Sequence, residues 1–341
     1  MYGIIDIGSN SVRLGVTDGE NTIKKILETT RLGEGLHETG RLSEEAQKRS
    51  VAAIERFRTE ARALGADKVF AFATEAVRKA ENGRSFAREV ERETGVPVEI
   101  LAGEKEAEIG LMGAVSGACG AVLDVGGAST ELAVKTGDGF YKRSLPLGCV
   151  VLKNACGEDE ILLEKMAAEA LQKSDFPESL PGIPLYGIGG TATTLAAFAL
   201  SMEEYDPDKV TGTVISADKA WELYQKIAAL SVKERLESGI PAGRADIIEG
   251  GAYWNAQLLR RLGNHVMIVS DRDNIEGYAK LLAARSGAAE KSSGALRNGA
   301  TEADRTTGGA EKGGAKVAGM VSGSAETVGV GTMTGRGKEG L

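Results

Sequence analysis

The chain of 341 residues has few of the residues that build disulfide frameworks and zinc centres. Its three cysteines, Cys119, Cys149 and Cys156, show no CxxC spacing, and an odd number of cysteines is typical of a protein in a reducing compartment. The two histidines, His37 and His265, lie far apart in the sequence, so we do not expect a zinc site built from histidine and cysteine. We therefore expect a cytoplasmic protein without disulfides.

Long apolar runs are also missing. No segment approaches the ~20 apolar residues that span a bilayer, and a strand begins almost at once, so we expect neither a membrane span nor a secretory leader. The net charge of −8 disfavours extensive nucleic-acid binding, although a local basic cleft stays possible. A hydrophobic content of 42% in 341 residues indicates a globular chain large enough for two domains.

What the sequence does contain is one pattern that occurs twice. Residues 4–16 read IIDIGSNSVRLGV, and residues 122–134 read VLDVGGASTELAV. When Asp6 is aligned with Asp124, each copy has an apolar strand, a carboxylate, a turn of small residues and a second alternating strand. Each copy therefore predicts a β-hairpin with a carboxylate at the end of its first strand.

The two turns have the composition of anion-binding loops. Glycine lets backbone amides approach an anion closely, and serine hydroxyls add further donors. Two such loops facing each other would hold a phosphate chain from both sides, whereas two ordinary hairpins are the simpler alternative. The predicted phosphate-binding residues are Gly8, Ser9, Asn10 and Ser11 in the first turn and Gly126, Gly127 and Ser129 in the second.

Strands alternate with helices along the rest of the chain, which is typical of two α/β domains. We place these domains at 1–118 and 119–285. We expect helices over 43–64, 74–78, 104–115, 159–173, 217–230, 245–262 and 274–284, an apolar helix after Gly189-Gly190-Thr191-Ala192-Thr193-Thr194, and further strands over 21–27, 68–73, 96–101, 184–188 and 266–269. Residues 286–341 are rich in glycine, alanine and serine and have no aromatic residue, so we expect a disordered tail.

Six ordered motifs resemble the exopolyphosphatase/guanosine pentaphosphate phosphohydrolase (Ppx/GppA) family, which belongs to the superfamily of actin, the sugar kinases and the heat-shock chaperone ATPases. The motifs are DIGSNS at 6–11, TEAVR at 74–78, GEKEA at 103–107, DVGGASTE at 124–131, GGT at 189–191 and RAD at 244–246. The resemblance covers roughly residues 1–284 and implies two actin-like (ribonuclease H-like) α/β domains with a central cleft.

The sequence departs from the family pattern in two places. Longer members continue with a helical region, whereas this chain continues with the low-complexity segment 286–341, so it resembles a short form. The family often has a glycine after Ser270-Asp271-Arg272, and Asp273 stands there in this chain.

The resemblance implies that Glu106 is the catalytic base that activates water. The residues alone leave this open, because Glu104, Glu106 and Glu108 all lie near the start of one predicted helix, where acidic side chains favour the helix dipole. The simpler alternative is an exposed, charged start of a helix.

Asp124 and Glu131 are the candidate Mg²⁺ ligands, and Asp6 is a third. Asp124 and Glu131 lie seven residues apart across a hairpin turn, so both could point into one cleft. For Glu131, a solvated carboxylate on a strand is the alternative. In the family that the chain resembles, both positions serve the metal and the reacting phosphate.

Further phosphate ligands are predicted outside the two turns. Arg78 lies one turn into a helix and could reach a phosphate, or could instead pair with Glu75 or Glu81. Alternation along the strand places Arg13 on the same face as Ser11, so it is a further candidate. The segment Gly189, Gly190 and Thr191 opens a helix after a strand, a place that favours an anion, and could meet a nucleotide or a distal part of polyphosphate.

Together, the resemblance implies a Mg²⁺-dependent hydrolase that removes the terminal phosphate of inorganic polyphosphate, or the 5′ γ-phosphate of guanosine pentaphosphate. Two alternatives stay open: a kinase or ATPase of the same superfamily, and a non-catalytic sensor of polyphosphate or alarmone. The sequence shows no sugar-binding insert of the kind that a sugar kinase would need. A sensor that only binds its ligand would not need a base such as Glu106. Family members often form homodimers, and we expect neither nucleic acid nor membrane as a partner.

Overall fold

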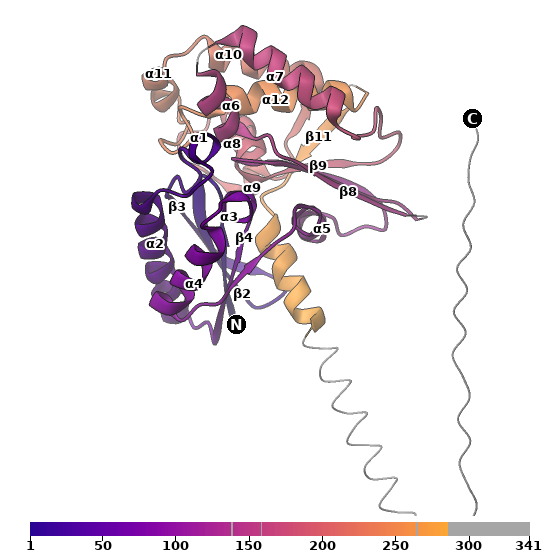
Figure 1. Cartoon of the computed structure of the whole chain (residues 1–341). Coiled ribbons are helices and arrows are strands. Elements are labelled where there is room, and N and C mark those ends of the chain that lie inside the picture. The colour runs from indigo at the N-terminus through magenta and orange to yellow at the C-terminus, as the bar shows by residue number, and fades with distance from the viewer. Residues whose placement is uncertain (138, 158, 264, 286–341) are drawn as a thin grey trace, which may run out of the picture. The chain divides into compact units, whose positions relative to one another are not determined.

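The structure is a computed structural model that describes residues 1–137, 139–157, 159–263 and 265–285. Within these ranges the chain forms two β-sheets, each with helices packed on it, which Figure 1 shows as a lower and an upper half. The segment predicted to be a disordered tail, 286–341, lies outside the described residues.

The first sheet has the strand order β3-β2-β1-β4-β5. Its strands are β1 (Tyr2–Ile7), β2 (Ser11–Thr17), β3 (Thr22–Thr29), β4 (Lys68–Ala73) and β5 (Val98–Ile100). The first three are antiparallel neighbours, whereas β4 and β5 run parallel to β1. The apolar run of β1 suits this central place, because a central strand is covered on both faces, and Ile4, Ile5 and Ile7 are fully buried.

Four helices follow strands of the first sheet: α1 (Leu36–Thr39), α2 (Glu44–Ala63), α3 (Glu75–Lys79) and α4 (Gly83–Thr94). The longest, α2, packs on β1 and β2 and against α4. It begins where the sequence predicts, because the hydroxyl of Ser43 accepts a hydrogen bond from the amide of Ala46 at 3.2 Å. Its buried residues Ala53, Ile54 and Phe57 recur at helical spacing and form the side that faces the sheet.

The second sheet has the strand order β10-β11-β9-β6-β7-β8. Its strands are β6 (Gly120–Val125), β7 (Thr130–Lys135), β8 (Phe140–Leu145), β9 (Leu185–Ile188), β10 (Val214–Ser216) and β11 (Val266–Val269). The order repeats that of the first sheet, since β6, β7 and β8 form an antiparallel meander and β9 runs parallel to β6. In the first hairpin Asp6 pairs with Arg13, and in the second Asp124 pairs with Glu131, so the sequence repeat is a structural repeat.

Helices α6 (Cys149–Cys156), α7 (Glu160–Lys173), α8 (Gly189–Ala199), α9 (Pro207–Val210), α10 (Ala217–Ala228), α11 (Val232–Glu237) and α12 (Ile248–Arg261) accompany the second sheet. At the centre of this half the ring of Trp254 is completely buried. Its indole N–H donates to the hydroxyl of Thr130 at 2.9 Å, and that hydroxyl donates to the carbonyl of Leu147 at 2.6 Å. The indole N–H of Trp254 and the hydroxyl of Thr130 therefore both have hydrogen-bond partners although they are buried.

Two helices cross between the halves. Helix α5 (Gly103–Ala114) follows β5 of the first sheet but packs on β7 and β8 of the second. A helix over 274–285 follows β11 of the second sheet, and Ile275 and Tyr278 pack with residues of the first sheet. The two helices touch at glycines: a Cβ atom at Gly113 or at Gly277 would overlap a backbone carbonyl of the other segment. These crossing helices therefore connect the two sheets.

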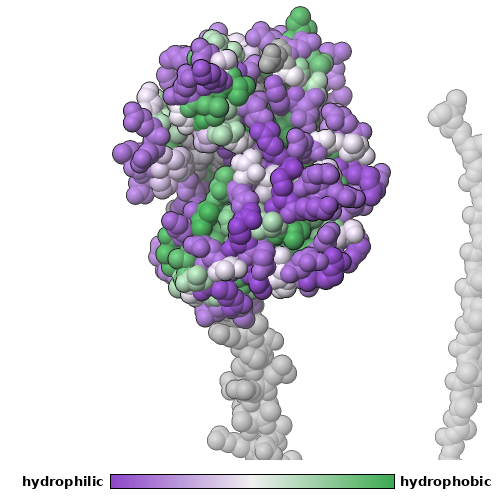
Figure 2. Space-filling view, turned by 90° about the vertical axis from the view of Figure 1, so that its left-hand side faces the viewer, coloured by the Kyte–Doolittle hydropathy of each residue, from purple (hydrophilic) through white to green (hydrophobic). Residues whose placement is uncertain are grey.

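The predicted alternation of strands and helices is confirmed, and the strands of the two sheets come from 2–100 and 120–269. The division into domains at 1–118 and 119–285 stays a prediction. Every helix within the described ranges lacks the length or the apolar character that a bilayer-spanning segment needs. On the face shown in Figure 2, hydrophilic residues predominate and hydrophobic residues form small patches between them.

Candidate active site

The turns of the two repeated hairpins line one cavity of about 80 Å³, enough for several water molecules. The cavity is also lined by residues of α5, of the start of α8 and of the helix over 274–285. Of the predicted site residues it brings together Asp6, Gly8, Ser9, Asn10, Ser11, Arg13, Glu106, Asp124, Gly126, Gly127, Ser129, Gly189 and Gly190. Residues from segments that are far apart in the sequence thus meet in one place.

The two turns have the same local structure. The amide of Gly8 donates to the carbonyl of Ser11 at 3.1 Å, and the amide of Gly126 donates to the carbonyl of Ser129 at 2.9 Å. They also lie in contact, since a Cβ atom at Gly127 would be 3.1 Å from the Cβ atom of Ser9. Only small residues fit at this approach, which explains the composition of both turns.

The turns offer backbone donors that the protein does not use. Within the described part of the chain, the amides of Ser9, Asn10, Gly127 and Ala128 donate to no protein acceptor. Buried backbone amides are nearly always paired, so four free amides around one cavity indicate a site for an acceptor from outside the protein. An anion with several oxygens, such as a phosphate group, would satisfy them.

The glycine pair at the start of α8 makes room for two charged side chains. Gly189 has a φ of +73°, and a Cβ atom there would overlap the carboxylate of Asp124. A Cβ atom at Gly190 would overlap the guanidinium of Arg244. Thr191 plays a different part, because its buried hydroxyl donates to the carbonyl of Val125 at 2.7 Å and does not line the cavity. This hydrogen bond connects α8 to β6.

Four carboxyl groups are buried at or beside the cavity. Burial raises the pKa of Asp124 to about 7, and burial together with the charge of Asp124 raises the pKa of Glu131 to about 8. Burial, with the charge of Glu131, raises the pKa of Glu106 well above its usual range, and burial also raises that of Asp6. Such a cluster favours the binding of a cation, which would stabilise the ionised forms.

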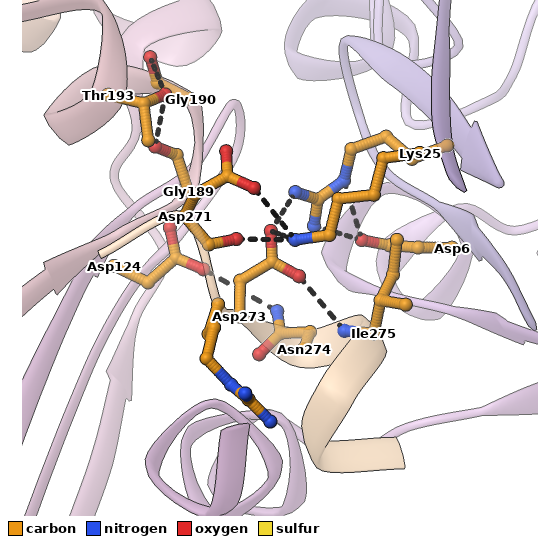
Figure 3. Close-up of polar contacts among 12 residues, drawn as sticks. Asp6, Lys25, Asp124, Gly189, Gly190, Thr193, Asp271, Asp273, Asn274 and Ile275 are labelled. Atoms are coloured by element: carbon orange, nitrogen blue, oxygen red, sulfur yellow. Dashed lines mark hydrogen bonds and ion pairs between the residues drawn. The ribbon is translucent and has the colours of Figure 1, made fainter. Parts of the chain in front are cut away.

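The two strand partners in the second hairpin point to different places. Asp124 lines the cavity, and Figure 3 shows it below Gly189 and beside Asn274. Glu131 is buried next to the cavity without lining it, and accepts a hydrogen bond from the hydroxyl of Ser144 at 2.6 Å. Of the three candidate metal ligands, the structure thus places Asp124 and Asp6 in the cavity and Glu131 behind it.

The residues present fit a hard cation such as Mg²⁺. One carboxylate oxygen of Asp6 and the side-chain oxygen of Asn274 are buried and have no hydrogen-bond partner among the described residues. The described ranges hold no group of three or more His, Cys, Asp or Glu side chains arranged for a metal. Mg²⁺ does not require such a cage, because it is usually held by one or two carboxylates together with substrate phosphates and water.

Three arginines lie in this region, and two of them are paired with carboxylates. Arg13 donates to Asp6 and to Asp273. Arg78 does not line the cavity: it donates to Glu75 and to the Leu101 carbonyl, and one guanidinium nitrogen lies 3.3 Å from Glu106. The predicted ion pair of Arg78 with Glu75 is therefore present, together with a link to the candidate base.

Arg244 is the third, and it has no ion pair or hydrogen-bond acceptor for its guanidinium among the described residues. Burial lowers the pKa of Arg244, although an arginine stays charged. It lies over Gly190 and lines the cavity, so it is the cation most available to an anionic ligand. The sequence identified Arg244 only as part of a motif and gave it no role.

Five further lining residues were not predicted from the sequence: Thr74, Val125, Ala128, Cys149 and Asn274. The amide of Asn274 lies 3.5 Å from Asp124, and burial raises the pKa of the Cys149 thiol. Thr74 lies between the end of β4 and the start of α3, and such helix starts at strand ends are where a sequence search could have found it. Asn274 begins the helix over 274–285 after the segment 270–273, which separates it from β11.

The model of the Ppx/GppA phosphatase family matches residues 15–280 of the chain. Exopolyphosphatase 2 of Mycobacterium tuberculosis is 31% identical over 310 residues, which cover 82% of this chain and 97% of that protein. The guanosine-5′-triphosphate,3′-diphosphate pyrophosphatase of Aeromonas salmonicida is 28% identical over 267 residues, covering 74% of this chain and 53% of that protein.

Solved structures agree with these matches. An exopolyphosphatase-like protein superposes with a TM-score of 0.71 at 28% identity, covering 82% of this chain and 96% of its own. A Ppx/GppA family member from Aquifex aeolicus superposes with a TM-score of 0.68 at 28% identity, covering 84% and 98%. The predicted fold class, two actin-like α/β halves around a central cleft, is thereby confirmed.

Proposed function

Because the chain belongs to the Ppx/GppA phosphatase family, we propose that it hydrolyses the terminal phosphoanhydride bond of inorganic polyphosphate. The observation that carries this proposal is the pair of facing turns, whose free amides at Ser9, Asn10, Gly127 and Ala128 surround one cavity beside a buried glutamate. The 5′ γ-phosphate of guanosine pentaphosphate is the second candidate, since a relative is a pyrophosphatase of that class.

The terminal phosphate group would occupy the cavity between the turns. The free amides would donate to its oxygens, and the guanidinium of Arg244 would balance part of its charge. Asp124 and Asp6 would hold Mg²⁺, which when bound supplies positive charge to the phosphate oxygens. These contacts fix the phosphorus atom in place, which is most of what phosphoryl transfer asks of a protein.

Glu106 is the proposed general base. It lies on α5, is 6% exposed and lines the same cavity as the turns that would hold the phosphate. Its carboxylate would take a proton from a water molecule whose oxygen bonds to the terminal phosphorus, while the bridging P–O bond breaks. The products are orthophosphate and a chain shorter by one unit. Arg78, 3.3 Å away, favours the ionised form that a base requires.

Phosphate release distinguishes this function from its alternatives. Purified protein would be given polyphosphate or guanosine pentaphosphate with Mg²⁺, and released orthophosphate would be measured beside the Glu106→Gln variant. Release by the wild type and its loss in the variant would support a hydrolase. Retention of polyphosphate without release would indicate the sensor, and transfer to an acceptor would indicate the kinase. The cytoplasmic location and the homodimer expected from the sequence belong to this proposal, and the mass in solution tests the second.

A further inference from the structure

A second cavity of about 320 Å³ adjoins the first, and both are lined by Arg13, Gly189, Gly190 and Arg244. This volume is at the lower end of the ~300–1,000 Å³ of ligand pockets. A substrate whose terminal phosphate lies between the turns can continue past Arg244 into the second cavity, because this residue lines both. The charge of the groups that line the second cavity therefore influences which substrates can bind.

Much of the second cavity is apolar, with walls formed by Ile26, Leu27, Pro241 and Ile275. Its charged groups gather on one side, where Lys25 on β3 meets Asp271 and Asp273 in the segment after β11. Figure 3 shows Asp273 near the centre of this group, with Lys25 to one side and Asn274 below.

Two cations line this side of the cavity, Lys25 and Arg13, and both are paired with carboxylates. The ammonium of Lys25 lies 3.2 Å from Asp271, 3.8 Å from Asp273 and 3.0 Å from Glu276. The guanidinium of Arg13 donates to Asp6 and to Asp273. Two cations thus share four carboxylates, so this side of the cavity has a surplus of negative charge. Of the described cations that line the two cavities, Arg244 at their junction is the one without an ion pair.

Asp273 is the carboxylate that both cations share, and it is fixed in place. It is 4% exposed and immediately precedes the helix over 274–285. Its side chain accepts a hydrogen bond from the amide of Ile275 at 3.0 Å, and its own amide donates to Glu276 at 2.7 Å, which is a reciprocal capping pair. The position of this charge is therefore set by the fold, not by a mobile side chain.

Polyphosphate and a nucleoside place different demands on such a cavity. Each unit of polyphosphate carries at least one negative charge, so a long chain needs a path with unpaired cations. A nucleoside or a short chain places little or no charge beyond the junction. With Lys25 and Arg13 neutralised, the second cavity offers a polyphosphate chain apolar walls and carboxylates.

We propose that Asp273 is a specificity-determining residue, which limits the site to substrates whose part beyond Arg244 is short or uncharged. This inference rests on the proposed phosphatase function. Asp273 acts by holding the charges of Arg13 and Lys25, so that a long polyphosphate chain gains nothing from them.

The test compares Asp273→Asn with the wild type, using the full chain. Asparagine has nearly the same shape and is an equally good helix cap, so the start of the helix is kept. Binding of tripolyphosphate and of long-chain polyphosphate would be measured at equilibrium, together with KM and kcat for both. In the variant we expect the affinity for the long chain, relative to tripolyphosphate, to rise roughly tenfold, the scale of one charge at this range.

Three companion variants make the test specific. Asp273→Glu restores the charge and should restore the wild-type preference. Asp271→Asn removes one of the three carboxylates around Lys25 and none around Arg13, so it should give a smaller shift in the same direction. This variant also serves if Asp273→Asn folds poorly. Glu45→Gln removes an exposed charge on α2 and should leave the preference unchanged.

An unchanged ratio of long-chain to tripolyphosphate affinity in both Asp273→Asn and Asp271→Asn would overturn the inference, as would an equal shift in Glu45→Gln. Failure of the proposed function looks different: the wild type would release no phosphate from any substrate. In that case the binding ratio would still decide whether Asp273 controls the accepted length.

Discussion

Replacing Glu106 by glutamine tests the proposed base and the buried carboxyl cluster in one variant. Glutamine keeps the size of the side chain and an oxygen that can accept from Arg78, which lies 3.3 Å from the glutamate. It removes the carboxylate that would take the proton. We expect kcat to fall by roughly 10²–10⁴, or about 3–5 kcal/mol in the activation free energy.

The same variant should have a different stability profile with pH. Burial raises the pKa of Glu106 in the folded protein, so the group holds its proton more tightly there than in the unfolded chain. Its contribution to stability is complete below the unfolded pKa of about 4.3 and is lost as the pH rises through the folded pKa. Glutamine does not titrate. The unfolding free energy of the variant, relative to the wild type, should therefore increase as the pH rises.

Phosphate release with Mg²⁺ gives kcat, and urea unfolding without Mg²⁺ across pH gives the stability profile. A variant with wild-type kcat would refute the role of Glu106 as base. Glu104 could hardly replace it, because Glu104 is exposed and lies 3.6 Å from Arg143. An unchanged stability profile would instead contradict the raised pKa of the buried Glu106 carboxyl group.

Four further predictions follow from the site and the crossing helices. Asp124→Asn should weaken the dependence of phosphate release on Mg²⁺, whereas wild-type activity that survives full chelation would remove the metal role. Gly190→Ala should displace the guanidinium of Arg244, and it should raise KM by about tenfold or more with little change in melting temperature. An unchanged KM would exclude Arg244 as a phosphate ligand. Gly277→Ala should force the crossing helices apart and destabilise the fold by about 1–3 kcal/mol in urea unfolding, and an unaltered midpoint would show that the contact relaxes freely. Removal of 286–341 should leave phosphate release and the melting temperature unchanged, and a drop of many degrees would contradict the expected disorder of this tail.

The hairpins could be predicted because their signal is local. Within each copy the carboxylates Asp6 and Asp124 end a strand, and the turn that follows closes by one hydrogen bond to Ser11 or Ser129. All of this is determined by about a dozen consecutive residues. The sequence therefore located both turns, and the order of apolar and polar residues located the strands that hold them.

Side-chain partners from distant segments could not be predicted. The hydroxyl of Thr191 meets a carbonyl that lies 66 residues earlier in the chain, and Arg13 meets Asp273 from 260 residues later. Arg244 stood in a recognised motif, but its role depends on its place over Gly190, which only the fold creates. Periodicity and composition carry no information on such pairs.

Some elements were not predicted because their patterns are weak. The strand β8 has no fully buried residue, so it lacks the apolar alternation of a half-buried strand. The strand β10 has only three residues. Both lie at the edges of the second sheet, where pairing to a neighbour, not local sequence, decides that they are strands.

The exchange of helices between the two halves has a consequence for how the protein unfolds. The first sheet is covered on one face by a helix from the end of the described chain, and Ile4 and Phe72 lie buried beneath it. The second sheet is covered by α5, which comes from the first half of the sequence. Neither core is complete without a segment from the other part of the chain. Melting should therefore be a single cooperative transition, and a fragment that ends between β5 and β6 would expose a large apolar surface.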